Sequence, residues 1–317
     1  MEETCFPILS SSLRGRPEMD DVYLPYEERR PDFQYQNVLL NILGTGFYTK
    51  NPFQTKGTFT SVTAPQMEFR MENGAPFITE RDISAFWQKP ISEIIAFING
   101  ARTLDQLRKY GNKQTWASWW RRWASPEKCA HFGLEAGDLG PGSYGAGYHH
   151  DGFNQWEHLV RQIRERPSLR THKVSPWIPE LCLQHNELQR QVVVAPCHGD
   201  VLVIVLEDKM ILRMDQRSGD VPVGIPSNMI QYAALLLMLA QVTGYKPYML
   251  IHSIHHAQIY EDQVEHARIL ISRLPIQFPT LRITDPSIKD LFAFRPHHFE
   301  LTDYHPHPSM NNIPVTE

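Results

Sequence analysis

The sequence is poor in cysteine and has neither a long apolar run nor a signal-peptide pattern. Its four cysteines, Cys5, Cys129, Cys182 and Cys197, are scattered and never spaced as Cys-x-x-Cys, which argues against a disulfide framework or a zinc knuckle. The first residues, MEETCFPILSSS, lack the basic and apolar regions of a signal peptide. The longest apolar stretch, residues 233–240, is too short to cross a membrane. We therefore expect a cytoplasmic protein with reduced thiols.

An excess of charge of one sign is also missing. The 31 basic and 35 acidic residues give a formal net charge of −4 at pH 7. This balance argues against a broad surface for nucleic acid, although a local anion pocket is compatible with it. No internal repeat or low-complexity block is present.

The chain is long enough for a large core, because 42% of its 317 residues are hydrophobic. Residues 1–35 are polar, charged and contain proline, so we expect an irregular N-terminal arm. Residues 36–317 are assigned to a single domain. Strand and helix patterns interleave there and hairpin patterns are frequent, which predicts an α/β protein of the α+β type with a mixed sheet.

Two segments have strand patterns. Residues 59–79 alternate polar and apolar side chains around Asn73 and Gly74, which predicts a strand, a turn and a second strand. Residues 201–215 contain two apolar runs joined by a short polar turn, which predicts another hairpin.

Three segments have helix patterns. Residues 90–100 begin with proline and end with glycine, which predicts a helix, because proline is common at the start of helices and glycine at their end. Residues 153–167 predict an amphipathic helix that ends at a proline. Its apolar face comprises Trp156, Leu159, Val160 and Ile163. Residues 226–247 are apolar nearly all round up to Gly244, which predicts the buried central helix.

Cys197 is the first candidate for chemistry, because it lies between a proline and a histidine just before a strand-like run. A nearby cation stabilises a thiolate, and Arg217 and Ser218 follow one strand later. If the two segments pair as a hairpin, both residues lie beside Cys197. The alternative is a structural cysteine, since free cysteine is among the most buried residue types.

Glu93 and Asn228 are two further candidates. Glu93 lies among apolar neighbours, and burial raises the pKa of a carboxyl group towards neutrality, which suits a proton shuttle. The alternative is a surface glutamate at a helix edge. Asn228 opens the central helix, and its amide carries the donor and the acceptor needed to read a uracil-like ring. The alternative is a helix cap.

Histidine and tryptophan clusters offer weaker signals. The runs HSIHH (252–256) and HPHP (305–308) have no carboxylates or cysteines at ligand spacing, so a metal is not expected. The tryptophan-rich segment 115–124 is typical of packing or of an interface, and alternatively stacks on a planar heterocycle.

Several longer motifs occur in a distinctive order. They are SEIIAFING (92–100), GDLGPGSYG (137–145), LRTHKVSPW (169–177), APCH (195–198), QRSGDVPVGIPSN (216–228) and DYHPHPSMNNIPVTE (303–317). Together they resemble the motifs of thymidylate synthase and its relatives, the pyrimidine nucleotide hydroxymethylases, with one extra residue in the second. The resemblance runs from about residue 54 to the C-terminus. It implies a thymidylate synthase-like fold with a mixed sheet and a buried central helix.

The resemblance also implies a reaction. A cysteine thiolate adds to C6 of a pyrimidine nucleotide monophosphate, which activates C5 towards the one-carbon unit of 5,10-methylenetetrahydrofolate. Hydride then gives a methyl group, whereas water gives a hydroxymethyl group. Folate is a co-substrate, no metal is required, and the family acts as a homodimer.

Site residues follow from the resemblance position by position. The catalytic group comprises Cys197, Glu93, Tyr144, His198, Asn228 and Trp116. The nucleotide group comprises Gln216, Arg217, Ser218, Asn228, Gln258 and Tyr260, with Arg170 reaching the site of the partner subunit. The folate group comprises Asp220, Trp116 and Val315.

Some positions depart from the family pattern. Thr171 replaces the second of two paired arginines, and Gln258 replaces the histidine two residues before the sugar-contacting tyrosine. The region of Gln54 and Lys56 lacks a phosphate-loop arginine. The chain ends in Glu317, where the reductive enzymes end in an apolar residue. The changes at the phosphate and sugar positions argue against ordinary dUMP recognition.

The sequence is therefore interpreted as a folate-dependent nucleotide 5-hydroxymethylase. Uracil is favoured over cytosine, because cytosine-specific relatives have an aspartate at the position of Asn228. A divergent thymidylate synthase is the alternative within the family. A catalytically silent protein that binds nucleotide or RNA is the alternative outside it. Four intact residues argue against that alternative, namely Cys197, Glu93, Asn228 and Asp220.

Overall fold

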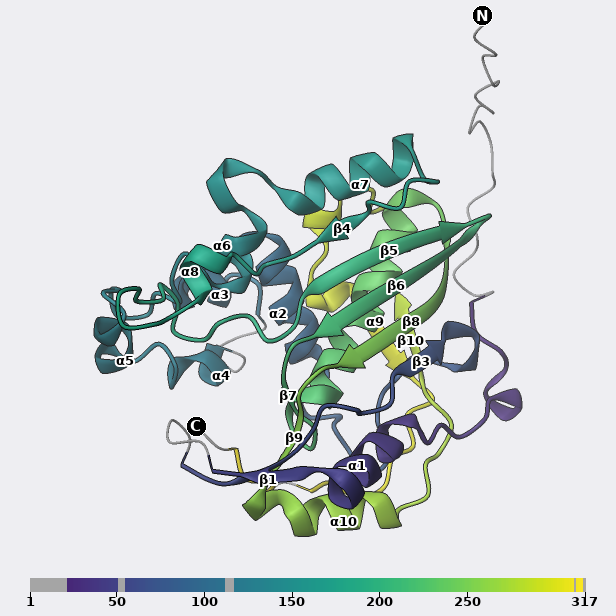
Figure 1. Ribbon diagram of the computed structural model, residues 1–317. Helices are drawn as coiled ribbons and strands as arrows, with labels where there is room; N and C mark the ends of the chain where they lie inside the picture. The colour runs from purple at the N-terminus through teal and green to yellow at the C-terminus, as the bar shows by residue number, and fades with distance from the viewer. Residues whose placement is uncertain (1–21, 51–54, 112–116, 311, 316–317) are drawn as a thin grey trace, which may run out of the picture.

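The computed structural model describes residues 22–50, 55–111, 117–310 and 312–315, and its strands form three sheets (Figure 1). The five-stranded sheet has the order β3 (Met67–Arg70), β8 (Lys246–Ile254), β6 (Lys209–Gln216), β5 (Asp200–Leu206), β4 (Lys173–Val174). The four-stranded sheet has the order β1 (Phe47–Thr49), β2 (Thr58–Ser61), β9 (Ala257–Tyr260), β7 (Gly219–Asp220). The third sheet pairs β10 (Thr280–Ile283) with β11 (Phe299–Thr302).

Helices connect and cover these sheets. The longer ones are α1 (Gln34–Thr45), α2 (Gln88–Ile98), α7 (Gln155–Glu165), α9 (Gly224–Thr243) and α10 (Val264–Ser272). The shorter ones are α3 (Leu104–Arg108), α4 (Ala117–Arg121), α5 (Pro126–His131), α6 (Tyr144–Tyr148) and α8 (Pro179–Cys182). The combination of mixed sheets and helices confirms the α+β fold.

The five-stranded sheet contains the predicted hairpin. Strands β5 and β6 pair antiparallel with Val203 opposite Leu212, whereas β6 and β8 run parallel with Leu212 opposite Leu250. The hairpin places the residues before β5 and the residues after β6 at the same end of the sheet. This arrangement positions the candidate nucleophile and arginine.

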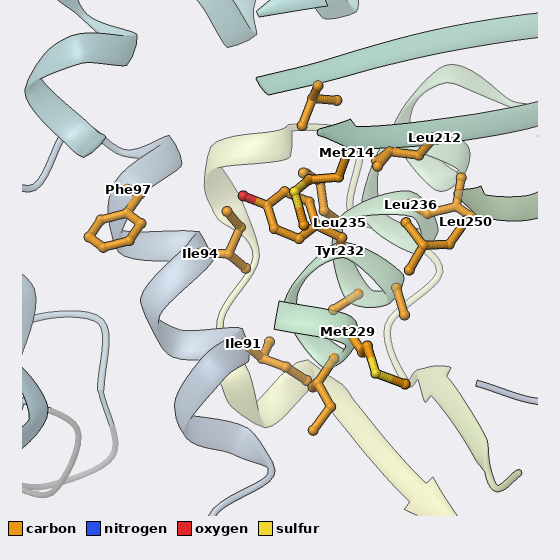
Figure 2. Close-up of a cluster of buried hydrophobic side chains, with 14 of the residues drawn as sticks. Ile91, Ile94, Phe97, Leu212, Met214, Met229, Tyr232, Leu235, Leu236 and Leu250 are labelled. Atoms are coloured by element: carbon orange, nitrogen blue, oxygen red, sulfur yellow. The ribbon is translucent and has the colours of Figure 1, made fainter. Parts of the chain in front are cut away.

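Helix α9 is the centre of the core. It begins close to the predicted position and ends at Gly244, whose φ of 81° lies in the left-handed region that favours glycine. Figure 2 shows Ile91 and Ile94 of α2 beside α9, with Leu212 and Leu250 from the sheet on its other side. Each such buried side chain contributes roughly 1.5–3 kcal/mol.

Helix α9 is longer than the apolar stretch of residues 233–240 that the sequence analysis considered too short to cross a membrane. By length and composition, residues 224–243 are long and apolar enough to cross a membrane, yet 94% of the most apolar 18-residue stretch of this helix is buried inside the protein. Because α9 packs against the sheet on one side and against α2 on another, its apolar composition is that of a core helix.

The amphipathic helix α7 forms as predicted. Its buried residues are Trp156, Leu159, Val160 and Ile163. The side chain of Asn154 caps its N-terminus by accepting hydrogen bonds from the backbone amides of Trp156 and Glu157. The spacing of apolar residues alone was sufficient to locate this helix.

The predicted hairpin over residues 59–79 is wrong. Strand β2 pairs with β1 and β9, whereas β3 pairs with β8. A turn does occur at Gly74, where φ is 105°, but the chain beyond it forms no strand. Residues 74–80 are all buried, without the alternation of buried and exposed side chains that a strand at a surface shows. This segment therefore fills the interior and forms no strand.

Within the predicted arm, residues 22–33 lie against the domain. The buried guanidinium of Arg29 donates hydrogen bonds to the carbonyl oxygens of Leu24 and Phe278 and to the hydroxyl of Thr280. Helix α1 begins at Gln34, close to the predicted boundary. A buried arginine with three acceptors ties this segment to the β10 region.

Glu80 provides a prediction about stability. Its side chain is 2% exposed, and burial raises the pKa of its carboxyl group from 4.5 to about 7. The unfolded chain therefore loses this proton at lower pH than the folded one, and stability falls as pH rises from 4.5 to 7. Glu80→Gln removes a cost of about 3 kcal/mol above pH 7, and its amide oxygen still accepts from the Thr79 amide.

Calorimetry at two pH values checks this prediction. Tm of Glu80→Gln is expected to exceed that of the parent by several degrees at pH 8 and to equal it at pH 4. Glu72→Gln, on the neighbouring exposed turn, is the control and should change neither value. A lower Tm of Glu80→Gln at pH 8 would contradict the argument.

Candidate functional site

Cys197 and Arg217 come together at the end of the β5–β6 hairpin, as the sequence predicted. The backbone amide of Arg217 donates to the carbonyl oxygen of Cys197 at 2.8 Å, and that of Ser218 donates to the same oxygen at 3.4 Å. One guanidinium nitrogen of Arg217 lies 3.4 Å from Cys197 Sγ. The described cysteines, Cys129, Cys182 and Cys197, are all free thiols.

The surroundings of Cys197 suit a nucleophile. Its half-buried side chain lines a cavity of about 290 Å³ together with Trp177, His198 and Arg217. The guanidinium also lies over the Trp177 ring, 5.4 Å from its centroid, which holds the cation in place. A fixed positive charge beside an accessible sulfur stabilises the thiolate, the reactive form.

Tyr144 and His198 supply neutral hydrogen-bonding groups next to Cys197. The hydroxyl of Tyr144 accepts from the Cys197 amide at 2.8 Å, and its ring stacks on Phe97 at 4.7 Å. His198 Nδ1 lies 2.7 Å from the hydroxyl of Tyr232. Burial lowers the pKa of His198 to about 3 and raises that of Tyr144 well above its ordinary value. Both groups are therefore neutral at pH 7 and suited to ordering water.

Glu93 is buried, which decides against the surface glutamate that the sequence had left open. Its carboxylate accepts hydrogen bonds of 2.5 Å from Trp120 Nε1 and from Gln231 Nε2. Burial raises the pKa of this carboxyl group to about 7. A carboxyl group that is half ionised near neutral pH both donates and accepts protons readily.

Asn228 does not cap α9, because the helix begins four residues earlier at Gly224. Its side chain is 7% exposed and bonds to two other amides. Asn228 Nδ2 donates to Gln231 Oε1 at 2.8 Å, and Asn228 Oδ1 accepts from Gln216 Nε2 at 3.1 Å. Gln231 thus links Asn228 to Glu93.

This network also borders a second cavity of about 480 Å³. Glu93 and Asn228 line it together with aromatic, cationic and C-terminal residues, namely Phe86, Trp119, Arg81, Lys89, Arg122, Met310, Ile313 and Val315. The Nε atom of Arg81 is buried without a hydrogen-bond partner. Aromatic walls and cations suit a flat heterocycle that carries carboxylates.

Asp220 and the C-terminal segment are joined by Gln263. Gln263 Nε2 donates to Asp220 Oδ2 at 2.9 Å and to the Pro314 carbonyl at 2.8 Å. Gln263 Oε1 accepts from the Tyr260 amide at 3.0 Å. Burial raises the pKa of Asp220 to about 7. Val315, which follows Pro314, remains 45% exposed beside the second cavity.

The structure brings most predicted residues together and leaves others apart. Gln258 lies opposite Asp220 across β7 and β9, and its Nε2 is 2.6 Å from His256 Nδ1. Arg170 is exposed between α7 and β4. Trp116, Gln54 and Glu317 lie outside the described residues.

Sequence reasoning missed several residues that the structure places at the site, among them Trp120, Gln231 and Gln263. Trp120 lies in the tryptophan cluster from which only Trp116 had been selected. Gln231 could have been identified from the sequence, because it is a polar residue within an otherwise apolar helix and lies three residues after Asn228, on the same helix face. No local pattern distinguishes Gln263 from a surface residue.

The histidine runs do not form a cluster. His252 is buried and bonds to Gln216, whereas His255 is exposed. His307 Nε2 lies 2.8 Å from the Leu274 carbonyl. Within the described ranges, no three His, Cys, Asp or Glu side chains are grouped so as to hold a metal ion.

Comparison with protein families gives one finding. Residues 33–315 match the family described as Thymidylate synthase, which covers most of the chain and all of the described site residues.

Proposed function

The chain belongs to the thymidylate synthase family, whose members are folate-dependent one-carbon transferases acting on C5 of a pyrimidine nucleotide, and we propose that this enzyme hydroxymethylates a uracil nucleotide. Covalent catalysis needs a thiolate, a proton shuttle and a base-reading amide within one site. Cys197 beside Arg217, and Glu93 linked to Asn228, supply these groups. That convergence is the observation on which the proposal rests.

Each residue has a defined task in this reaction. The Cys197 thiolate attacks C6 of the pyrimidine, and Arg217 with Ser218 binds the 5′-phosphate. Glu93 moves protons at the base, aided by water held by Tyr144 and His198. Asn228 reads the base edge, Gln216 supports it, and Tyr260 with Gln258 contacts the sugar.

The second cavity fits methylenetetrahydrofolate, which supplies the one-carbon unit when bound. Phe86 and Trp119 offer faces for the flat rings, with Val315 at the pterin. The family resemblance assigns Asp220 to the pterin as well, and Gln263 joins Asp220 to the C-terminal segment. The glutamate tail of the folate carries carboxylates. The guanidinium of Arg81, whose buried Nε has no hydrogen-bond partner, and the ammonium of Lys89 both complement these carboxylates. The residues present therefore fit this co-substrate.

The C-terminal tail favours hydroxymethylation over methylation. Water must be excluded for hydride transfer to succeed. Val315 is 45% exposed beside the second cavity, and Glu317 follows two residues later in the sequence. An ionised glutamate in this segment is costly to desolvate, so we expect it to disfavour dry closure.

Product analysis tests this choice. A uracil nucleotide incubated with enzyme and methylenetetrahydrofolate is expected to gain one CH₂O unit by mass, without the near-ultraviolet absorbance rise that accompanies dihydrofolate. A known thymidylate synthase serves as the positive control for absorbance. Stoichiometric dihydrofolate with a methylated nucleotide would identify the chain as a divergent thymidylate synthase.

A homodimer is proposed from the uncovered face of the five-stranded sheet. In Figure 1, α9 lies behind this sheet and no helix is drawn across its near face. Half-buried apolar residues on that face are Leu202, Ile204, Met249 and Ile251. A second copy packed there would bury them, and Arg170 would act in the partner's site.

A further inference from the structure

A row of hydroxyl groups runs from His198 into the interior of the protein. His198 Nδ1 lies 2.7 Å from the hydroxyl of Tyr232, and the hydroxyls of Tyr232 and Tyr148 are hydrogen-bonded to each other. The Tyr148 hydroxyl donates to the carbonyl oxygen of Gly199 at 3.0 Å. Both tyrosines are 0% exposed, so neither hydroxyl can bond to bulk water instead.

The carbonyl group at the inner end fixes the direction of this row. A backbone carbonyl only accepts, so Tyr148 gives its hydrogen to Gly199 and its oxygen accepts from Tyr232. Tyr232 has then used its own hydrogen, and its oxygen accepts the Nδ1–H of His198. Glycine at position 199 is required for this contact, because a Cβ atom there would lie 2.5 Å from the Tyr148 hydroxyl oxygen. The row of hydroxyls therefore requires the proton of His198 on Nδ1.

Protonation at Nδ1 leaves Nε2 with a lone pair and no hydrogen. Burial lowers the pKa of His198 to about 3, so the ring is neutral at pH 7 and carries a single N–H. The Tyr144 ring packs against the His198 ring with centroids 4.5 Å apart, and the Tyr232 ring meets it edge-on at 5.7 Å. With Nδ1 held in the interior, Nε2 is the ring nitrogen left for the cavity that His198 lines together with Cys197.

The tautomer decides how a water molecule binds at Nε2. A bare Nε2 accepts an O–H hydrogen, so the bound water keeps both of its lone pairs for the site, whereas an Nε2–H group would occupy one of them. The proposed function uses this water in proton transfers at the base. Resting on that function for its role in turnover, we propose that Tyr148 and Tyr232 are positioning residues that hold His198 as the Nδ1–H tautomer and thereby orient a water molecule beside Cys197.

Nitrogen-15 NMR measures the tautomer directly, because the protonated and the bare nitrogen of a neutral imidazole resonate far apart. The enzyme is labelled with nitrogen-15 in histidine and measured at pH 7 without substrate, and His198→Gln identifies the signals of His198. We expect a protonated Nδ1 and a bare Nε2. A protonated Nε2 in the parent enzyme would overturn the proposal.

Tyr148→Phe removes the middle of the row and keeps the aromatic ring. The Tyr232 hydrogen is then free to turn towards Nδ1, so the Nε2–H tautomer of His198 is expected to become the major form. Turnover is expected to fall by about tenfold or more, while KM for the nucleotide stays within about threefold. Tyr23→Phe is the matched control, because the Tyr23 hydroxyl also donates to a backbone carbonyl, that of Leu281 in β10, at 2.8 Å. This control is expected to change neither the tautomer nor kcat.

The outcomes separate this inference from the proposed function. A parent enzyme without turnover on any pyrimidine nucleotide would refute the proposed function, and the NMR spectrum would still decide the tautomer. An unchanged tautomer in Tyr148→Phe would show that the row of hydroxyls does not hold His198. A changed tautomer with unchanged kcat would remove its role in orienting water. If Tyr148→Phe does not fold, Tyr232→Phe removes the direct acceptor of the Nδ1 hydrogen and is held to the same criteria.

Discussion

Cys197→Ser is expected to lower turnover by at least about 10³-fold while nucleotide affinity stays close to that of the parent. A serine hydroxyl remains protonated at neutral pH, and the adjacent cation Arg217 stabilises a thiolate but removes no proton from a hydroxyl. The change is nearly isosteric, so the cavity beside Trp177 keeps its shape. Steady-state kinetics and calorimetric titration with nucleotide measure the two quantities.

Covalent trapping supplies the control for this prediction. Parent enzyme with a 5-fluoropyrimidine nucleotide and methylenetetrahydrofolate should gain the mass of both molecules, whereas Cys197→Ser should gain neither. Cys129→Ser, which alters a buried free thiol elsewhere, should behave as the parent does. Turnover of Cys197→Ser within tenfold of the parent would rule out the covalent mechanism.

The same variant tests the proposed dimer. Arg170→Ala should also be nearly inactive if Arg170 completes the partner's site. In a mixture of the two variants, a shared dimer has one site with both Cys197 and Arg170 intact. Exchange of subunits should therefore restore about a quarter of the parent activity. No recovery after verified exchange would remove Arg170 from the partner's site.

Asn228→Asp is expected to shift the ratio of kcat/KM from uracil towards cytosine nucleotides by about tenfold or more. The substituted side chain lacks the NH₂ group that donates to Gln231, so the Gln231 amide must turn and donate its own NH₂ group to the new carboxyl oxygen. Once protonated, the carboxyl group then presents an acceptor and one O–H donor, which match the 4-amino group and N3 of cytosine. Competition between dUMP and dCMP measures the ratio directly.

A second asparagine provides the matched control. Asn154→Asp makes the same chemical change at the N-terminus of α7, where a carboxylate caps a helix as well as an amide does. Its base preference should equal that of the parent. An unchanged ratio in Asn228→Asp would show that other groups determine base choice.

Local patterns predicted the parts of the fold that depend on neighbours in the chain. The apolar spacing in α7 and the continuous apolarity of α9 reflect burial of one helix face and of a whole helix, respectively. The β5–β6 hairpin needs only a short turn between two apolar runs. The strand predicted after Gly74 was wrong, because β2 and β3 find their partners in distant strands and residues 74–80 fill the interior.

The sequence by itself determined the family and the pairing of Cys197, the proposed nucleophile, with Arg217, because one hairpin joins these two residues and the longer motifs occur in a fixed order. Only the tertiary structure decided how Glu93 and Asn228 are connected. Gln231 reaches Glu93 across 138 positions, and Gln263 joins Asp220 to Pro314. Such hydrogen-bond partners cannot be identified from a periodic pattern in a single sequence, because a hydrogen bond between side chains depends on where the elements pack and not on spacing along the chain.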